Sequence, residues 1–247
     1  MQDFTSRRLF VDAPLAAGAA IELTREQANY LLNVLRLGAG AGLLIFNGRD
    51  GEWRALLEPI SRKSAVLRAE SCLRPQEIGP DLDYLFAPIK HARLDYMAQK
   101  AVEMGARRLR PVLTRRTQNS RLNLERMRAN VIEAAEQCGI LSLAEVEAEA
   151  KLEIVLAQWP QDRLLIFCDE ACDVADPLAA LREAGAGYGK FGVLIGPEGG
   201  FDDSERAMLA GIANVARISL GPRILRADTA AVAALALTQA ALGDWRC

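Results

Sequence analysis

The sequence contains a single histidine, His91, and its five cysteines include no pair separated by two residues. One imidazole excludes metal sites built from several histidines. The cysteine spacing favours neither a disulfide framework nor a zinc ribbon. We therefore expect a protein without a metal ion that works in a reducing, cytoplasmic compartment.

Long apolar stretches are also missing. The first eight residues lead into no apolar run of the kind that a secretory signal needs. The most apolar segment, Ala230–Leu242, is shorter than a membrane span and contains Thr238 and Gln239. This segment predicts a buried helix, and we expect no membrane partner.

The remaining composition is that of an ordinary globular chain. Of 247 residues, 51% are hydrophobic and 25% charged, enough to bury a core in one large domain or two small ones. The net charge of -2 is unevenly spread, because residues 76–130 hold 11 basic and 6 acidic side chains, whereas residues 131–247 hold 9 and 18. This basic middle indicates a local surface for a polyanion, the alternative being a solvated helix face without a partner.

Residues 1–73 favour a small β-rich domain. Thr24 and Gln27 have the spacing of a capping box, which opens a helix whose apolar residues continue to Leu35. Short strands surround this helix and suggest a compact barrel; they are predicted at 8–11, 43–46, 52–60 and 64–69. Residues 74–81 hold two prolines and a glycine and predict a linker.

Residues 82–247 alternate between strand and helix patterns, which predicts an α/β domain with a parallel sheet covered on both faces. The strands are expected at 82–87, 109–113, 163–167, 191–195 and 215–218. The helices are expected at 94–105, 124–138, from Pro177, at 202–213 and at 228–242.

Two loops follow buried strands of this domain, at the edge where open α/β sheets bind ligands. The first is Ile195–Phe201, with three glycines and a proline, and the second is Leu220–Arg226. Glycine lets backbone approach a ligand closely. Other glycine clusters lack the context of a dinucleotide fold or a P-loop, since each precedes a strand.

Together, Ile195–Phe201 and Leu220–Ala230 resemble the paired C-terminal motifs of the RsmE family, SPOUT-class methyltransferases that act on N3 of a uridine in 16S ribosomal RNA of the small subunit. Three upstream segments strengthen the resemblance: Val34–Gly38, Gln99–Ala106 and Ala134–Cys138. The resemblance implies an N-terminal PUA-like RNA-binding barrel, a C-terminal domain with a deep trefoil knot, and a homodimer. Ala230–Leu242 is then a candidate interface helix, unless it is buried in its own core.

The resemblance also implies that S-adenosyl-L-methionine binds between the two loops. The cofactor residues expected from it are Ile195, Gly196, Pro197, Glu198, Gly199, Gly200, Leu220, Gly221, Ile224, Leu225 and Arg226. N3 must lose its proton before it can accept the methyl group, so Arg226 is the catalytic cation expected to stabilise the developing imide anion. Asp228 is expected to accept the proton or orient Arg226, with a helix cap as the alternative.

RNA would meet basic side chains of both domains, which position phosphates without reading sequence. They are Arg7, Arg8 and Arg36 in the first domain, and Lys90, Arg93, Lys100, Arg115 and Arg116 in the basic middle.

The sequence departs from the family pattern at four positions. Ile140 replaces an arginine, Asp228 a glutamate, Ala144 a proline and Tyr30 a frequent histidine. Two alternatives therefore stay open: a non-catalytic RNA-binding or ribosome-assembly protein on the same fold, and a SPOUT methyltransferase acting on another RNA. A Rossmann-type dehydrogenase is a distant further reading, because its fingerprint is absent.

Overall fold

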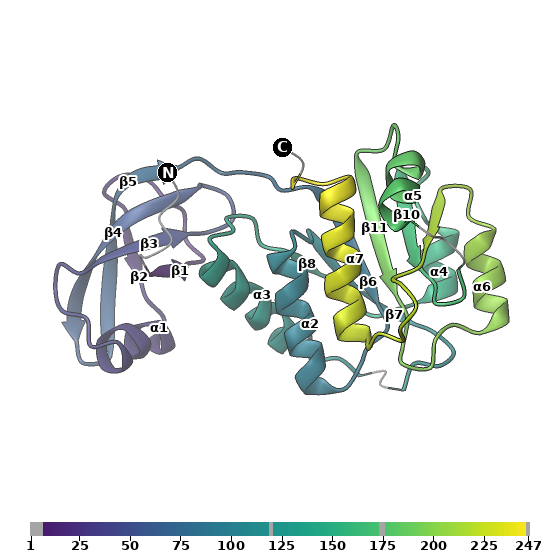
Figure 1. Ribbon diagram of the computed structural model, residues 1–247. Coiled ribbons are helices and arrows are strands. Elements are labelled where there is room, and N and C mark those ends of the chain that lie inside the picture. The colour runs from purple at the N-terminus through teal and green to yellow at the C-terminus, as the bar shows by residue number, and fades with distance from the viewer. Residues whose placement is uncertain (1–6, 119–120, 173–175, 246–247) are drawn as a thin grey trace. The chain divides into compact units, whose positions relative to one another are not determined.

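The computed structural model describes residues 7–118, 121–172 and 176–245, with the backbone alone at 91 and 92. The chain forms two compact units, seen in Figure 1. The first runs to Ile78 and also takes in Ala135–Leu143; the second comprises Gly79–Ala134 and the chain from Ala144 onward. The predicted domains, 1–73 and 82–247, did not assign Ala135–Leu143 to the first unit.

The first unit is built on a five-stranded sheet in the order β1-β3-β4-β5-β2. Only the β1–β3 pair is parallel. A tight turn joins β3 to β4: Asn47 Oδ1 accepts hydrogen bonds from the N–H groups of Arg49 and Asp50, as its turn chemistry predicts. The strands are β1 (Arg8–Phe10), β2 (Ala20–Glu22), β3 (Gly42–Phe46), β4 (Glu52–Ser61) and β5 (Ser64–Arg74). The sequence did not predict β2.

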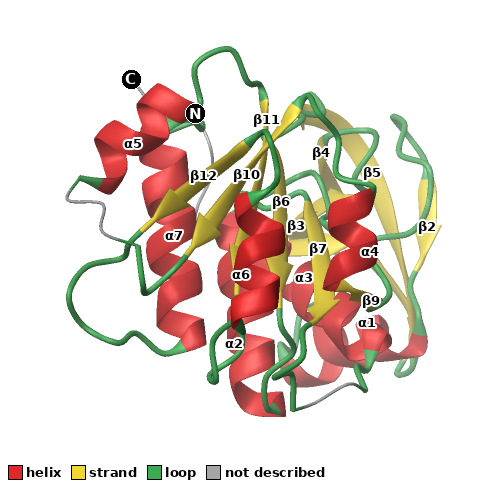
Figure 2. Ribbon diagram, turned by 90° about the vertical axis from the view of Figure 1, so that its right-hand side faces the viewer, coloured by secondary structure: helices red, strands yellow, loops and turns green. Residues whose placement is uncertain are grey.

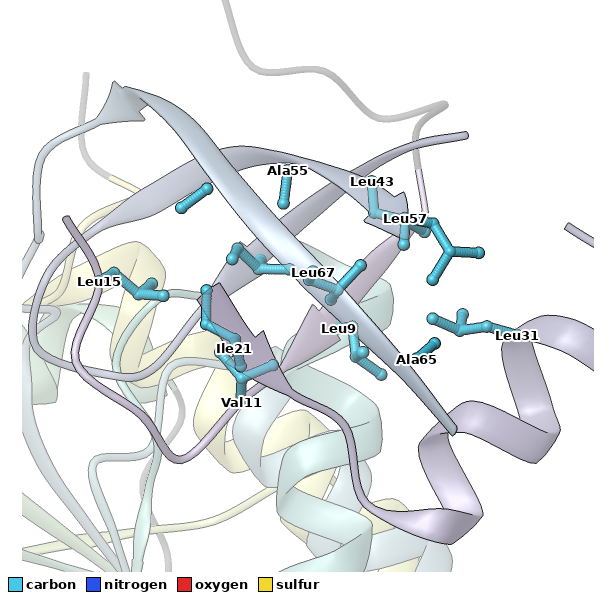
Figure 3. Close-up of a cluster of buried hydrophobic side chains, with 12 residues drawn as sticks. Leu9, Val11, Leu15, Ile21, Leu31, Leu43, Ala55, Leu57, Ala65 and Leu67 are labelled. Atoms are coloured by element: carbon cyan, nitrogen blue, oxygen red, sulfur yellow. The ribbon is translucent and has the colours of Figure 1, made fainter. Parts of the chain in front are cut away.

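An apolar core lies beneath this sheet. In the middle of β4 and β5 every second side chain turns inward, as Ala55 and Leu57 do in β4 and Ala65, Leu67 and Ala69 do in β5. Leu31 of the helical segment closes the cluster, as Figure 3 shows.

The helical segment begins as predicted but does not stay an α-helix. Thr24 and Gln27 form both hydrogen bonds of the capping box that opens α1 (Arg25–Asn29). The chain then widens into a π-helix, η1 (Tyr30–Val34), with Leu35 N–H donating to Tyr30 O. Arg36 follows with a φ of 54°, a left-handed conformation that is uncommon for a residue with a side chain. The prediction of one regular helix to Leu35 is therefore wrong.

Residues Ala135–Leu143 belong to the first unit through specific contacts. Glu136 accepts a hydrogen bond from Phe10 N–H at 2.8 Å. Ala135 and Leu141 pack on Phe46. The segment covers an apolar side chain and satisfies a backbone donor of the first sheet.

The second unit is organised around a parallel sheet in the order β12-β10-β11-β6-β7-β8, with β9 paired to β7. All of its pairings are parallel, so the prediction of a parallel α/β sheet is confirmed. The strands are β6 (Asp81–Phe86), β7 (Arg108–Leu113), β8 (Glu145–Val146), β9 (Ala150–Lys151), β10 (Arg163–Cys168), β11 (Lys190–Ile195) and β12 (Val215–Ile218).

Helices cover both faces of this sheet (Figures 1 and 2). On one face, α2 and α5 flank α7, which packs on β11; on the other, α4 and α6 pack over a core that includes Trp159 and Phe201. The helices are α2 (His91–Glu103), α3 (Leu124–Cys138), α4 (Leu152–Ala157), α5 (Pro177–Ala184), α6 (Asp203–Ala210) and α7 (Ala227–Ala241). Of these, α4 was not predicted.

The amino ends of the parallel strands are joined by a buried ion network. Asp83 of β6 is 1% exposed and contacts Arg108 at 2.6 Å and Arg110 at 3.1 Å. Arg163 of β10 pairs with Asp81 at 2.8 Å. Several cations around one buried carboxylate compensate for its lost hydration. The opposite, carboxyl edge of the sheet is therefore the one left for ligands.

Candidate active site

A cavity of about 370 Å³ lies at the carboxyl edge of the second unit's sheet. The loops after β11 and β12 line it, and all eleven residues predicted to bind the cofactor are among its lining residues. The structure thus brings together two segments that α6 and β12 separate in the sequence.

The loop after β11 needs its glycines for two different reasons. A Cβ atom on Gly196 would lie 2.6 Å from the ring of Phe201, which is buried behind the loop. Gly200 has a φ of 67° and donates its N–H to Pro197 O, closing a tight turn. A side chain at Gly196 would therefore collide with Phe201, and one at Gly200 would be strained.

A third loop, which the sequence reasoning missed, completes the cavity wall. It follows β10 and contributes Cys168, Asp169 and Glu170. The signal was available, because these residues leave a buried strand at the same carboxyl edge. Burial raises the pKa of the Cys168 thiol to about 12, so this cysteine is a neutral wall group.

Asp169 is a buried carboxylate held by two arginines. Burial by itself raises its pKa, but the hydrogen bond from Arg217, the N–H of Ala171 and the charge of Arg206 bring the pKa below its usual range. Its side chain is fully buried, and Arg217 Nη2 lies 2.6 Å from Oδ2. Asp169 therefore stays ionised at neutral pH.

Arg206 ties two loops of the cavity together. Its guanidinium pairs with Asp169 and, at 2.6 Å, with Glu170, both on the β10 loop. The Nε atom donates to Phe201 O on the β11 loop at 3.3 Å. One side chain of α6 thus fixes the spacing of two loops that line the cavity.

The neighbouring Glu205 ties the β11 loop to a fourth loop, the one after β7. Glu205 Oε2 accepts from Asp202 N–H at 3.0 Å in a capping box, and Oε1 accepts from Arg115 N–H at 2.8 Å. Arg116 donates to Gly199 O at 2.6 Å. Arg115 also pairs with Asp202 at 3.3 Å. The expected phosphate contacts Arg115 and Arg116 therefore also brace the cavity loop.

The two predicted catalytic residues lie at the start of α7. Arg226 lines the cavity, is exposed, and is the N-cap residue without a side-chain cap. Asp228 is not the N-cap residue, because Arg226 occupies that position; it lies in the first helical turn, where its carboxylate accepts a hydrogen bond from Thr229 N–H at 2.9 Å. It is not among the residues that line the cavity. Ile224, one of the residues expected to bind the cofactor, is 99% exposed.

Comparison with known proteins establishes the family. Residues 76–239 match the family model of the RNA methyltransferase domain, and residues 23–70 match that of the RNA methyltransferase PUA domain. Ribosomal RNA small subunit methyltransferase E of Rickettsia conorii is 31% identical over 230 residues, 93% of each chain. The chain belongs to this family of RNA methyltransferases.

Two solved structures resemble this family member over almost its full length. A methyltransferase from Legionella pneumophila, in complex with SAM, is 28% identical with a TM-score of 0.83, covering 96% of this chain and 98% of its own. Ribosomal RNA small subunit methyltransferase E of Neisseria gonorrhoeae, bound to S-adenosyl methionine, is 26% identical with a TM-score of 0.81, covering 97% and 99%. The resemblance to the RsmE family is confirmed.

The basic residues of this methyltransferase have different surroundings. The prediction that Arg8 contacts RNA is wrong. Its side chain is only 3% exposed and pairs with Glu52 at 2.8 Å, so it cannot reach a phosphate at the surface. Lys100 pairs with Glu103 at 2.6 Å. Arg7, Arg36 and Lys90 are exposed, and Arg93 is half-buried. RNA contact by Arg7, Arg36, Lys90 and Arg93 stays a prediction.

The structure shows the surroundings of the residues that depart from the family pattern. Ile140 packs on the apolar cluster of Phe46, Ala135 and Leu141, where its side chain suits the surroundings. Tyr30 starts η1 and is 49% exposed, whereas Ala144 is buried. The Ile140 side chain therefore contributes to packing within the first unit.

The part of the chain that the structure describes has neither a cluster of metal ligands nor a helix suited to a membrane. It contains no group of three His, Cys, Asp or Glu side chains placed to hold a metal ion. None of its helices has the length and hydropathy required to cross a membrane.

Proposed function

We propose that this protein transfers a methyl group from S-adenosyl-L-methionine to N3 of a specific uridine in 16S ribosomal RNA. The observation that carries the proposal is the cavity between the β11 and β12 loops, in the unit that matches the RNA methyltransferase domain. Relatives named ribosomal RNA small subunit methyltransferase E support the substrate, and solved neighbours with bound SAM support the cofactor.

The cavity fits this cofactor in size and lining. Its volume of about 370 Å³ is within the range of small-molecule sites. Ile195, Leu220 and Leu225 offer apolar contact for a purine, and the glycine turns bring peptide N–H and C=O groups to the cavity wall. When bound, the cofactor supplies a methyl group on a sulfonium, an electrophile that needs alignment more than activation.

Arg226 acts on the uridine in this proposal. N3 of uridine carries a proton and is used in base pairing, so the base must be unpaired to react. Loss of that proton leaves negative charge on O2 and O4, and a guanidinium at the cavity rim stabilises it. Arg226 has no ion-pair partner within the described residues, and its charge is therefore available. Asp228, two residues on, is the proposed proton acceptor or orienting group.

We also propose that the protein acts as a homodimer through the outer face of α7. The inner face is buried in its own core through Ala231, Ala234 and Leu235. The outer side chains, including Val232 and Leu237, are apolar and only half-buried, and no charged residue occurs from Thr229 to Gly243. A second copy would cover this face together with the exposed Ile224 near the cavity.

The remaining proposals concern architecture and compartment. The meeting of residues 195–201 and 220–226 around one cavity supports a trefoil knot in the C-terminal domain. The enclosed core of the five-stranded sheet supports a PUA-like barrel. The proposed barrel comprises residues 1–73 and the proposed knotted domain residues 82–247, with a linker at 74–81. A cytoplasmic location agrees with an RNA substrate of the ribosome and with Cys72, Cys168 and Cys172, which form no disulfide.

The decisive experiment is a methylation assay with nucleoside analysis. Protein and S-adenosyl-L-methionine are incubated with small ribosomal subunits, naked 16S RNA or transfer RNA, and digested nucleosides are separated by mass spectrometry. We expect N3-methyluridine from ribosomal RNA. Methylation of transfer RNA alone, or of a ribose oxygen, would contradict the proposed substrate or atom.

Two variants test the assigned cation in the same assay. Removing one group that stabilises a developing anion typically costs about 100- to 1000-fold in kcat, and we expect a loss of this size for Arg226→Ala. Arg182→Ala removes an exposed arginine of α5 that does not line the cavity and should keep parental activity. Equal activity of the two variants would contradict the role of Arg226. Binding of the RNA without any methylation would favour a non-catalytic protein, which the named relatives do not support.

A further inference from the structure

A second concave site lies in the first unit, between the helical segment and the turn that joins β4 to β5. It is lined only by polar side chains, namely Arg25, Glu26, Asn29, Asn33, Arg62 and Lys63. Asn33 holds the two walls together, because its Nδ2 donates to Arg62 O at 3.3 Å and to Asn29 Oδ1 at 2.9 Å. We call this site the polar groove.

The polar groove concentrates positive charge without compensation. Arg25, Arg62 and Lys63 are exposed and have no ion pair within the described residues, and Glu26 is the one acid among the lining residues. Two other exposed arginines of the same unit are paired: Arg54 lies 3.2 Å from Glu70, and Arg68 lies 2.6 Å from Glu58. The three cations of the groove have no such carboxylate partner within the described residues.

The sequence of the turn between β4 and β5 also favours a groove that binds a polyanion. Arg62 and Lys63 are the two loop residues of the β4–β5 hairpin, whose flanking residues Ser61 and Ser64 pair in the ladder. Two-residue hairpin loops favour glycine and asparagine. Two long cations at these positions give up the favoured turn chemistry and place both charges beside Arg25.

Apolar surface adjoins the groove on the same helical segment. Tyr30 follows Asn29 in the chain and is 49% exposed, and Val34 follows Asn33 and is 61% exposed. Aromatic rings stack with unpaired bases, whereas cations track the phosphate backbone. Amides such as those of Asn29 hydrogen-bond to sugars or base edges.

We propose that the polar groove binds the sugar–phosphate backbone of a single-stranded segment of the RNA substrate, remote in sequence from the methyl-transfer cavity. The inference rests on the proposed function for the kind of nucleic acid. Three cations and a neighbouring exposed tyrosine match a chain that carries phosphates and unstacked bases together. A duplex offers the phosphates but keeps its bases stacked.

Binding of a labelled RNA tests the groove. The probe is a fluorescein-labelled, uridine-containing, single-stranded RNA of twenty nucleotides, followed by anisotropy between 50 and 300 mM KCl, with the matching duplex as a second probe. The test variant is Arg25→Gln/Arg62→Gln/Lys63→Gln. The matched control, Arg49→Gln/Arg54→Gln/Arg68→Gln, removes three charges from exposed arginines of the same unit that are already paired.

We expect the groove variant to bind the single strand at least tenfold more weakly than the parent, and the control less than threefold. Loss of three phosphate contacts should lower the slope of log K against log salt by about 2, since each contributes about 0.7 on a single strand. Equal Kd values and slopes for the two variants would overturn the proposal, as would equal loss of duplex and single-strand binding. Both variants should bind S-adenosyl-L-methionine like the parent. If the parent methylates RNA but the groove variant binds RNA as the control does, the groove proposal alone is refuted. If the parent binds RNA through the groove without methylating it, the proposed function alone is refuted.

Discussion

Arg206 and Arg217 both bind the buried carboxylate of Asp169, but only Arg206 also reaches Glu170 and the carbonyl of Phe201. This difference makes a matched pair of substitutions, Arg206→Gln and Arg217→Gln. Each removes one cation from Asp169 and leaves the other in place. Only the first releases the β11 loop of the cavity from the β10 loop.

The expected magnitudes follow from these contacts. Hydrogen bonds to charged groups contribute about 1.5–3 kcal/mol, and because Asp169 keeps one arginine in either variant, we expect the free energy of unfolding to fall by about 1–3 kcal/mol in both. Ordering one backbone residue costs about 1–2 kcal/mol. If Arg206→Gln frees one residue of the β11 loop, which the ligand must then order, cofactor affinity falls by about 5- to 30-fold. Arg217→Gln should change it less than threefold.

Isothermal titration with S-adenosyl-L-methionine gives the two affinities, and thermal unfolding of the same samples gives the two stabilities. A tenfold loss of affinity confined to Arg206→Gln, at similar unfolding temperatures, would support the loop tether. Equal affinities in the two variants would refute it, because the loss would then follow general stability and not the spacing of the loops.

Three further predictions concern the cavity and the interface. Gly200→Ala places a Cβ atom 2.7 Å from Glu170 at a φ of 67° and should weaken cofactor binding about tenfold, whereas Gly187→Ala, at a φ of 89° with no neighbour within 4 Å, should cost about 1 kcal/mol of stability and no affinity, as calorimetry will measure. Because the pKa of Asp169 is lowered on folding, the carboxylate stabilises the protein above its ordinary pKa of about 4, and this stabilisation is lost as the pH falls through the lowered value. Asp169→Asn should therefore lower the unfolding temperature at pH 7, and the difference from the parent should shrink as the pH falls below about 4. Leu237→Arg should convert the proposed dimer into a monomer in sedimentation experiments, and a dimeric variant would exclude the outer face of α7.

The parallel sheet and the two loops that line the cavity, residues 195–201 and 220–226, were predictable because they depend on local patterns. Buried strands give apolar runs, and the glycines of residues 195–201 follow such a run directly. The helix at Leu124–Cys138 was predicted with its observed bounds, since its apolar spacing is regular. Short elements such as α4 carry too few residues for periodicity to separate them from loops.

The features that escaped prediction depend on contacts between distant segments. Arg8 has the sequence of an exposed cation, but strand pairing places β1 beside β3, and Glu52 at the start of β4 then buries its charge. Asp169 lines the cavity because it follows β10, but the arginines that hold its carboxylate, Arg206 and Arg217, are 37 and 48 residues away. The local spacing of residues in the sequence predicts none of these ion pairs.

The assignment of Ala135–Leu143 to the first unit has a consequence for synthesis on the ribosome. When Ile78 has been added, the sheet of the first unit has all five strands but lacks the carboxylate that binds Phe10 N–H and the side chains that cover Phe46. At about 5–20 residues per second, the missing segment follows several seconds later. During that interval the nascent sheet exposes an aromatic side chain and an unpaired backbone donor, which are binding features for a chaperone. Completion of the N-terminal unit therefore waits for the middle of the chain.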